Sequence, residues 1–212
     1  MSPGIAGTGV DDLISALIRM DRIAIREILS PGGEAAEKNE MVETLIVPAL
    51  EEIGRRWQDG SLAISQVYMA GILIEEVIGT LFPESDLKEK NPERIATVVL
   101  EDYHMLGERI VSTHLIGSGY SPVRYGRKDV EELVALVKAD KIRYLVISTL
   151  MLPSALRIRE VSNRLAGEGV KIIVGGAPFR YDPELGPEVG ADRVCFTASD
   201  AVLAIRDLEA GR

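Results

Sequence analysis

The chain has 212 residues, of which 46% are hydrophobic, so it is long enough to form one large domain or two small ones. It carries 33 acidic and 24 basic residues, a net charge of −9, which disfavours contact with the phosphate backbone of nucleic acids. The N-terminus shows no basic-then-apolar signal pattern, and no apolar run reaches the roughly 18 residues of a membrane span. These features predict a cytoplasmic protein.

The N-terminal part of the chain is predicted to be helical. Residues 1–9 are rich in glycine and are expected to be flexible. Apolar residues recur at helical spacing over 10–82 and predict a four-helix bundle, with helices over about 11–20, 21–30, 37–58 and 65–81. Asp11 or Asp12 can cap the first helix and Asp21 the second. Pro48 either kinks the third helix or stands in the first turn of a restarted one.

The C-terminal part alternates strands and helices. Charged residues and two prolines over 83–93 predict a linker, followed by a second domain over 94–212. Apolar runs predict strands over 95–100, 123–125, 142–148, 171–176 and 193–196. Helices are expected over about 108–119, 128–139, 154–167, 182–190 and 199–209. This alternation is typical of a doubly wound, flavodoxin-like (Rossmann-like) parallel sheet of five strands.

The series Asp102-x-His104-x-x-Gly107 follows the first predicted strand. An imidazole near a carboxylate is suited to metal binding, because one ring nitrogen can bind the metal while the other donates to the carboxylate. The alternative is a surface histidine beside a solvated aspartate in an ordinary loop between a strand and a helix.

Two further motifs end the third and fourth predicted strands. These are Ser148-x-Leu150 and the pair Gly175-Gly176, where the missing Cβ atoms allow close approach of a ligand. Because carboxyl ends of parallel strands share one edge, all three motifs are expected to line one crevice. The alternatives stay open: a hydroxyl that satisfies a nearby amide, a leucine of the core, and a plain turn.

Together, the three motifs resemble the signature of cobalamin-binding domains in methionine synthase and in corrinoid methyl-carrier proteins. The resemblance implies that His104 binds cobalt in place of the corrinoid's own base, with Asp102 as its hydrogen-bond partner and Ser148 next in the relay. It also implies that Leu150, Gly175 and Gly176 line the slot for the nucleotide tail.

This sequence departs from the family pattern around Gly107. Many relatives carry an acidic residue after the histidine and Lys-Asn after the glycine. Here Met105 follows the histidine, and Glu108 and Arg109 follow the glycine. The cobalt ligand is unaffected by this departure, but polar contacts around the corrin edge are in question.

The helical part resembles the cap module that covers the upper face of the cofactor in corrinoid carriers and cobalamin photosensors. By this resemblance Trp57, Val67, Tyr68 and Met69 are candidates for an apolar lid. The alternative is that they belong to the bundle core. In the photosensors a Glu-His pair stands where this chain has Val67 and Tyr68, so the upper histidine ligand is missing.

Two other residues of ligand type are expected to be structural. His114, the second histidine, is expected to pack on the surface or in the core. Cys195, the one cysteine, is expected to be a buried core thiol.

The resemblance implies a corrinoid protein that carries a methyl group on cobalt and does not complete catalysis alone. Its expected partners are a substrate-specific methyltransferase, an acceptor methyltransferase and a reductive activator, with a homodimer as one arrangement. The alternative is a cobalamin-dependent sensor that lacks its own DNA-binding domain.

Overall fold

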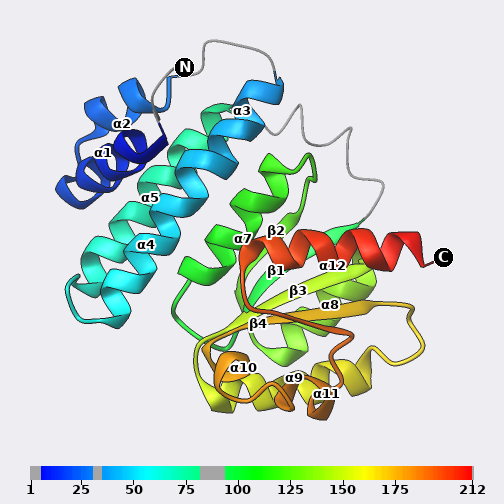
Figure 1. Cartoon of the computed structure of the whole chain (residues 1–212). Coiled ribbons are helices and arrows are strands. Elements are labelled where there is room, and N and C mark those ends of the chain that lie inside the picture. Colours follow the sequence, from blue (N-terminus) through cyan, green and yellow to red (C-terminus); the bar gives the residue numbers. More distant parts are fainter. Residues whose placement is uncertain (1–5, 31–34, 82–93, 212) are drawn as a thin grey trace. The chain divides into compact units, whose positions relative to one another are not determined.

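The computed structural model describes residues 6–30, 35–81 and 94–211. The predicted linker over 83–93 and most of the glycine-rich N-terminus lie outside these residues. By its contacts the chain divides into two compact units (Figure 1). The helical unit spans Met1–Glu89 with Ile116–Gly119, and the sheet unit spans Lys90–Leu115 with Tyr120–Arg212.

The described part of the helical unit contains α1 (Ala6–Arg19), α2 (Arg22–Ile28), α3 (Ala35–Met41), the π-helical segment η1 (Val42–Ile46), α4 (Val47–Gln58) and α5 (Ile64–Leu81). The prediction that Asp11 or Asp12 caps the first helix is wrong, because α1 begins at Ala6. A Cβ at Gly9 would lie 3.2 Å from Leu45 Cδ2, so this early turn packs closely against η1.

Two other local predictions in this unit are confirmed. The Asp21 side chain accepts a hydrogen bond from Ala24 N at 3.1 Å and so caps α2. The predicted third helix is divided, and Pro48 stands in the first turn of α4 directly after η1. Proline has no N–H to donate to a carbonyl of the preceding turn, and its ring crowds the carbonyl oxygen four residues earlier. The wider π-helical turn before Pro48 accommodates both effects.

Helix α5 is long and apolar enough to match a membrane span in length and composition, with a mean hydropathy of 1.3 over 18 residues. The sequence prediction overlooked it because Glu75 and Glu76 interrupt the apolar run. The helix contacts α1 and α4, and its buried residues include Leu73, Ile74 and Ile78. Of the residues of α5, 39% are buried, so the helix packs one face against the other helices of the unit.

The sheet unit contains five parallel strands in the order β2-β1-β3-β4-β5. They are β1 (Ile95–Leu100), β2 (Val123–Lys128), β3 (Tyr144–Thr149), β4 (Lys171–Gly176) and β5 (Arg193–Cys195). Its helices are α7 (Leu106–Gly117), α8 (Val130–Ala139), α9 (Leu152–Arg164), α10 (Ala177–Tyr181), α11 (Leu185–Glu188) and α12 (Ala198–Ala210). The predicted doubly wound, flavodoxin-like class is confirmed.

Some element bounds differ from the prediction. Helix α8 was expected from Lys128, but this residue ends β2, and Asp129 caps α8 with a reciprocal capping box to Glu132. The helix expected over 182–190 is replaced by α10, which begins directly after β4, and by the short α11. Asp182 is the C-cap of α10, so the chain leaves the helical conformation where a helix start was expected.

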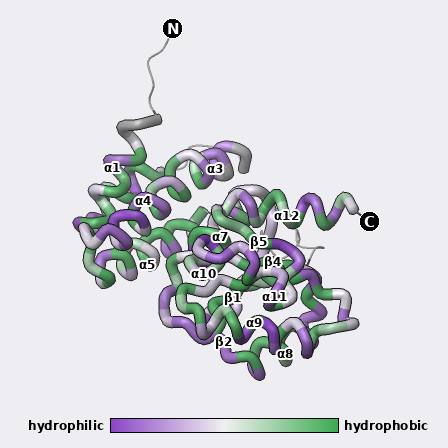
Figure 2. Tube along the Cα trace, turned by 60° about the horizontal axis from the view of Figure 1, so that its bottom comes forward, coloured by the Kyte–Doolittle hydropathy of each residue, from purple (hydrophilic) through white to green (hydrophobic). Residues whose placement is uncertain are grey.

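Each face of the sheet packs against a separate apolar core. One core joins the strands to α8, α9, α10 and α11, and the other joins them to α7 and α12. Residues of β3 alternate between the two, with Leu145 and Ile147 in the first and Tyr144 and Val146 in the second. Strand β1 is buried along its whole length and β3 almost so, whereas only Tyr125 of the edge strand β2 is buried. Hydrophobic and hydrophilic segments alternate along the helices in Figure 2.

Candidate functional site

The three predicted motifs lie at the carboxyl ends of adjacent strands. The Asp102 to Gly107 segment follows β1, Ser148 lies near the end of β3, and the two glycines end β4. Strand β3 lies directly between β1 and β4 (Figure 1), where Ser148 pairs with Val99 on one side and Gly175 on the other. The chain passes from β1 to β2 on one side and then to β3 on the other, so the strand order reverses at β1. Sheets of this kind bind ligands at the carboxyl ends of the strands where the order reverses.

Small residues form a row on the sheet face covered by α7 and α12. Ser148 and Gly175 point to this face because each lies two residues after a residue of its core, Val146 in β3 and Ile173 in β4. Gly107 lies next to Ser148, since a Cβ at Gly107 would lie 2.7 Å from Ser148 Oγ. These small residues therefore allow α7 to pack closely against the end of β3, and β5 against the end of β4.

Gly176 is required by the protein backbone itself. Its φ angle is +123°, and an added Cβ would lie 1.8 Å from the carbonyl oxygen of Thr149. At Gly175 the contact is milder, with a Cβ placed 3.1 Å from the carbonyl oxygen of Cys195. Packing between strands therefore accounts for this pair of glycines, and their contact with a ligand stays a prediction.

Asp102 caps helix α9 from a distant part of the chain. Its side-chain Oδ2 accepts hydrogen bonds from Leu150 N at 2.6 Å and Met151 N at 3.2 Å. Its Oδ1 accepts one from Ser154 Oγ at 3.0 Å. The N-cap residue of α9 is Met151, which has no capping oxygen, so the buried carboxylate satisfies amides that α9 cannot satisfy itself.

The hydroxyl that donates to Asp102 is that of Ser154, a residue the sequence reasoning missed. Its signal was its place in the first turn of a helix that starts just after the Ser148-x-Leu150 motif. Leu150 contributes its backbone N–H to the Asp102 carboxylate, in addition to a partly buried side chain. His104 is also partly buried, two residues beyond the fixed Asp102.

Glu108, one of the departures from the family pattern, belongs to a buried polar network. Arg124 donates to its two carboxylate oxygens at 3.0 and 2.9 Å, and Thr97 and Ser112 each donate at 2.7 Å. Burial raises the pKa of the Glu108 carboxyl, but the Arg124 charge and these hydrogen bonds outweigh burial and bring the pKa below its usual value. Glu108 therefore ties α7 to β1 and β2.

The other residues singled out from the sequence differ in how deeply they are buried. His114 is buried in α7, and Cys195 is buried with its thiol pKa raised to about 12 by burial. Of the proposed lid residues, Val67 is 3% exposed and belongs to the helical core, whereas Tyr68 is 55% exposed. Trp57 and Met69 are partly buried.

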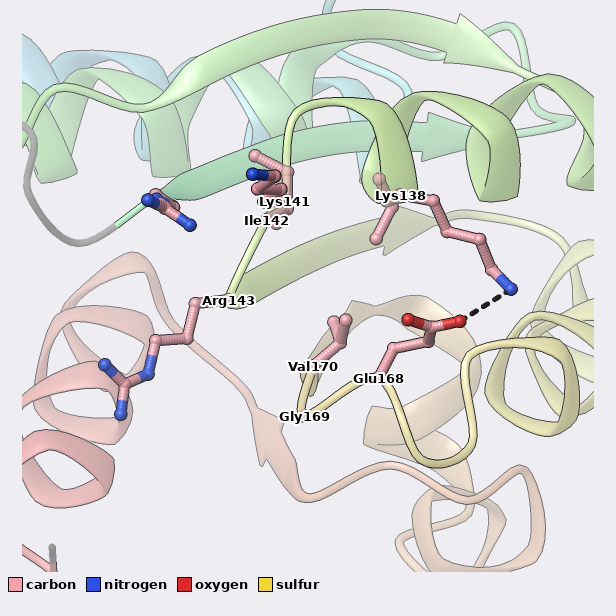
Figure 3. A pocket seen from close by; sticks show the side chains of 9 residues that line it. Lys138, Lys141, Ile142, Arg143, Glu168, Gly169 and Val170 are labelled. Carbon is pink, nitrogen blue, oxygen red and sulfur yellow. Dashed lines mark ion pairs between the residues drawn. The ribbon is translucent and has the colours of Figure 1, made fainter.

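A hollow of about 540 Å³ lies at the opposite, amino-terminal edge of the sheet (Figure 3). Arg94, Lys141 and Arg143 line it, with Lys138 paired to Glu168 at 2.8 Å. Lys138 lies in the last turn of α8, where a cation complements the negative helix end. The predicted site residues do not line this hollow, so the carboxyl-terminal edge is the candidate site.

A family model described as a B12 binding domain matches residues 93–206, which is more than half of the chain. The chain belongs to this B12-binding family. A second model, also described as a B12 binding domain, matches residues 10–81. The cofactor prediction is thereby confirmed: the family binds a corrinoid, cobalamin or a close relative.

Similar proteins support the family. Dimethylamine corrinoid protein 1 of Methanosarcina acetivorans is 28% identical over 210 residues, covering 94% of this chain and 96% of that protein. Trimethylamine corrinoid protein 2 of Methanosarcina mazei is 27% identical, covering 85% and 84%. The structure of the monomethylamine corrinoid protein of Methanosarcina barkeri shares the fold, with a TM-score of 0.66, 23% identity and coverage of 94% and 98%.

The residues at this edge fit a corrinoid. The described residues contain no group of three or more His, Cys, Asp or Glu side chains that could hold a bare metal ion. A corrin ring supplies four nitrogen ligands of its own, so a single imidazole such as that of His104 suffices, and imidazole is a suitable ligand for cobalt. Gly107 and Gly175 pack closely against neighbouring protein atoms, so their contact with the corrinoid stays a prediction.

Proposed function

We propose that this B12-binding protein carries a methyl group on cobalt between partner methyltransferases, with His104 replacing the corrinoid's own base as the lower ligand. The observation that carries the proposal is the meeting of three motifs at the carboxyl ends of β1, β3 and β4. The names of the relatives, corrinoid proteins of dimethylamine and trimethylamine systems, favour methyl transfer over sensing.

In this proposal each residue at the edge has a separate task. His104 would hold the cobalt of a bound corrinoid, which would supply a metal able to accept and release a methyl group. Asp102 is bonded to the start of α9 and so fixes the loop after β1. In this proposal its carboxylate also accepts a hydrogen bond from the imidazole N–H of His104. Ser148 is proposed to be the next member of the relay, and Leu150, Gly175 and Gly176 to line the slot for the nucleotide tail.

The protein provides no second reacting group in this proposal, so methyl donor and acceptor are brought by partners. The expected partners are a substrate-specific methyltransferase that would supply the methyl group, an acceptor methyltransferase that would take it, and a reductive activator. Trp57, Tyr68 and Met69 of the helical unit are proposed to shield the methyl group from water, whereas the buried Val67 belongs to the core of that unit.

The test uses purified protein mixed with hydroxocobalamin and passed through a desalting column. We expect coloured protein, whose visible spectrum shows an axial imidazole in the wild type and lacks it in His104→Ala. His114→Gln, which changes the second histidine, is the matched control and should keep the wild-type spectrum. Colourless wild-type protein, or an unchanged spectrum in His104→Ala, would contradict the proposal.

A methyl-transfer assay tests the carrier role separately. The protein loaded with methylcobalamin is mixed with methyltransferases encoded beside its gene, and loss of the methyl group is followed in the visible spectrum. We expect demethylation that depends on a partner enzyme. A light-driven change in assembly of the adenosylcobalamin complex, without demethylation, would favour the sensor.

A further inference from the structure

The residue before Asp102 has an unusual backbone conformation. Glu101 has a φ angle of +58°, and the Asp102 N–H donates to the Leu100 carbonyl at 2.7 Å, closing a tight three-residue turn. A residue with a side chain adopts this conformation only at a cost in free energy, and it persists where the surroundings fix it. The described residues include three others of this kind, Met20, Arg94 and Lys141, and none of them lies at the carboxyl-terminal edge of the sheet.

Contacts from three directions fix this turn. The Glu101 N–H donates to the Lys128 carbonyl at 2.9 Å, and the Glu101 carbonyl accepts from the Arg127 guanidinium at 3.3 Å. From α9, Arg157 Nε donates to the Glu101 carboxylate at 3.3 Å. Strands β1 and β2 and helix α9 are thus joined at one residue.

Arg127 also contacts the residue on the other side of Asp102. Its guanidinium lies over the Tyr103 ring, 4.3 Å from the ring centre, and this ring is 81% exposed. Residues 101 and 103 are therefore both held by Arg127, while residue 102 is held by α9. The chain reaches His104 directly from these three fixed residues.

We infer that Arg127 and Arg157 are positioning residues for His104, because they hold Glu101 and Tyr103 and so set where the imidazole leaves the sheet. The inference rests on the proposed role of His104 as cobalt ligand. Outer contacts that orient a metal ligand commonly change metal affinity by about 10- to 100-fold when removed.

A purely structural role predicts something different. Arg157 is 47% exposed and Glu101 30% exposed, and exposed ion pairs contribute little to global stability. Removing either arginine should therefore leave the melting temperature of the cofactor-free protein almost unchanged. A change in cobalt ligation without a change in melting temperature separates positioning from stabilisation.

The test is electron paramagnetic resonance of the protein loaded with cobalamin and reduced to cobalt(II). Protein labelled with nitrogen-15 in histidine splits each cobalt line into two if a histidine is the axial ligand, whereas the cofactor's own nitrogen-14 base splits it into three. Variants are Arg127→Met, Arg157→Met and Glu101→Ala. Arg164→Met is the matched control, because Arg164 forms an exposed ion pair from the same helix, with Glu131 at 2.7 Å.

We expect two-line splitting in the wild type and in Arg164→Met, and its partial loss in the other variants, with cobalamin affinity weakened at least several-fold. Glu101→Gln, which keeps an acceptor for Arg157, should restore most of the two-line signal. Wild-type protein without this signal would overturn the proposed ligand itself. Full two-line signals and unchanged affinity in Arg127→Met and Arg157→Met, with the wild type also showing two lines, would overturn the positioning role alone.

Discussion

Two buried carboxylates lie close together in the sequence of the sheet unit, and they are satisfied in different ways. Asp102 is 4% exposed and is bonded by two backbone N–H groups and the Ser154 hydroxyl. Glu108 is 1% exposed and is bonded by the Arg124 guanidinium together with the hydroxyls of Thr97 and Ser112.

The difference separates a structural carboxylate from a candidate functional one. The charge of Glu108 is neutralised by an arginine, and its oxygens are committed to groups within the core. Asp102 accepts its hydrogen bonds from uncharged donors at a helix start, and in the proposed function its negative charge polarises the His104 imidazole. Asp102 therefore combines a capping role with a place at the proposed cofactor edge.

The largest effect is expected when Arg124 is replaced by methionine. The Glu108 charge would then be buried without its partner, which costs about 3–5 kcal/mol of unfolding free energy. Urea unfolding measures this loss, and the protein that remains folded should keep the wild-type cobalamin spectrum. The double variant Glu108→Gln with Arg124→Met should recover part of the loss, and a loss under about 1 kcal/mol would show that Glu108 is not tightly paired.

A smaller loss of stability is expected for Asp102→Asn, but with a changed spectrum. The side-chain NH₂ of the new asparagine can face the N–H groups of Leu150 and Met151, and two donors cannot bond to each other. A buried polar group left without a partner in this way costs about 1–3 kcal/mol. Without the carboxylate charge, the proposed His104 ligand should bind cobalt more weakly. Ser154→Ala is the control, because it removes one donor and keeps the charge, and an Asp102→Asn spectrum identical to it would assign Asp102 a capping role only.

The sequence predicted the elements that depend on local pattern. The strands over 95–100 and 171–176 were placed at their observed bounds, because buried parallel strands have nearly continuous apolar runs. Their carboxyl ends then located the three motifs on one edge. Errors occurred where tertiary packing decided the outcome, as at the start of α1 against η1 and at the two short helices after β4.

The candidate site was predicted in its position but not in its supporting contacts. The motif pattern identified Asp102 and His104, whereas Arg127 and Arg157 lie on other elements and have no fixed spacing from the motif. Their contacts depend on how β2 and α9 pack beside β1, which no local pattern encodes. Glu101 also escaped notice, because a left-handed glutamate leaves no signal in composition or periodicity.

The smallest effect is expected in the pH dependence of stability. The Glu108 pKa lies below its usual value in the folded protein, so this carboxylate favours the folded state at neutral pH and loses that contribution as the pH falls through its folded-state pKa. The wild type should therefore lose stability more steeply than Glu108→Gln in urea unfolding as the pH falls from about 5.5 to below 4.5, the usual pKa of this carboxyl. Parallel slopes for the two proteins would mean that Glu108 has the same pKa folded and unfolded, and the contrast with Asp102 would then have to rest on geometry alone.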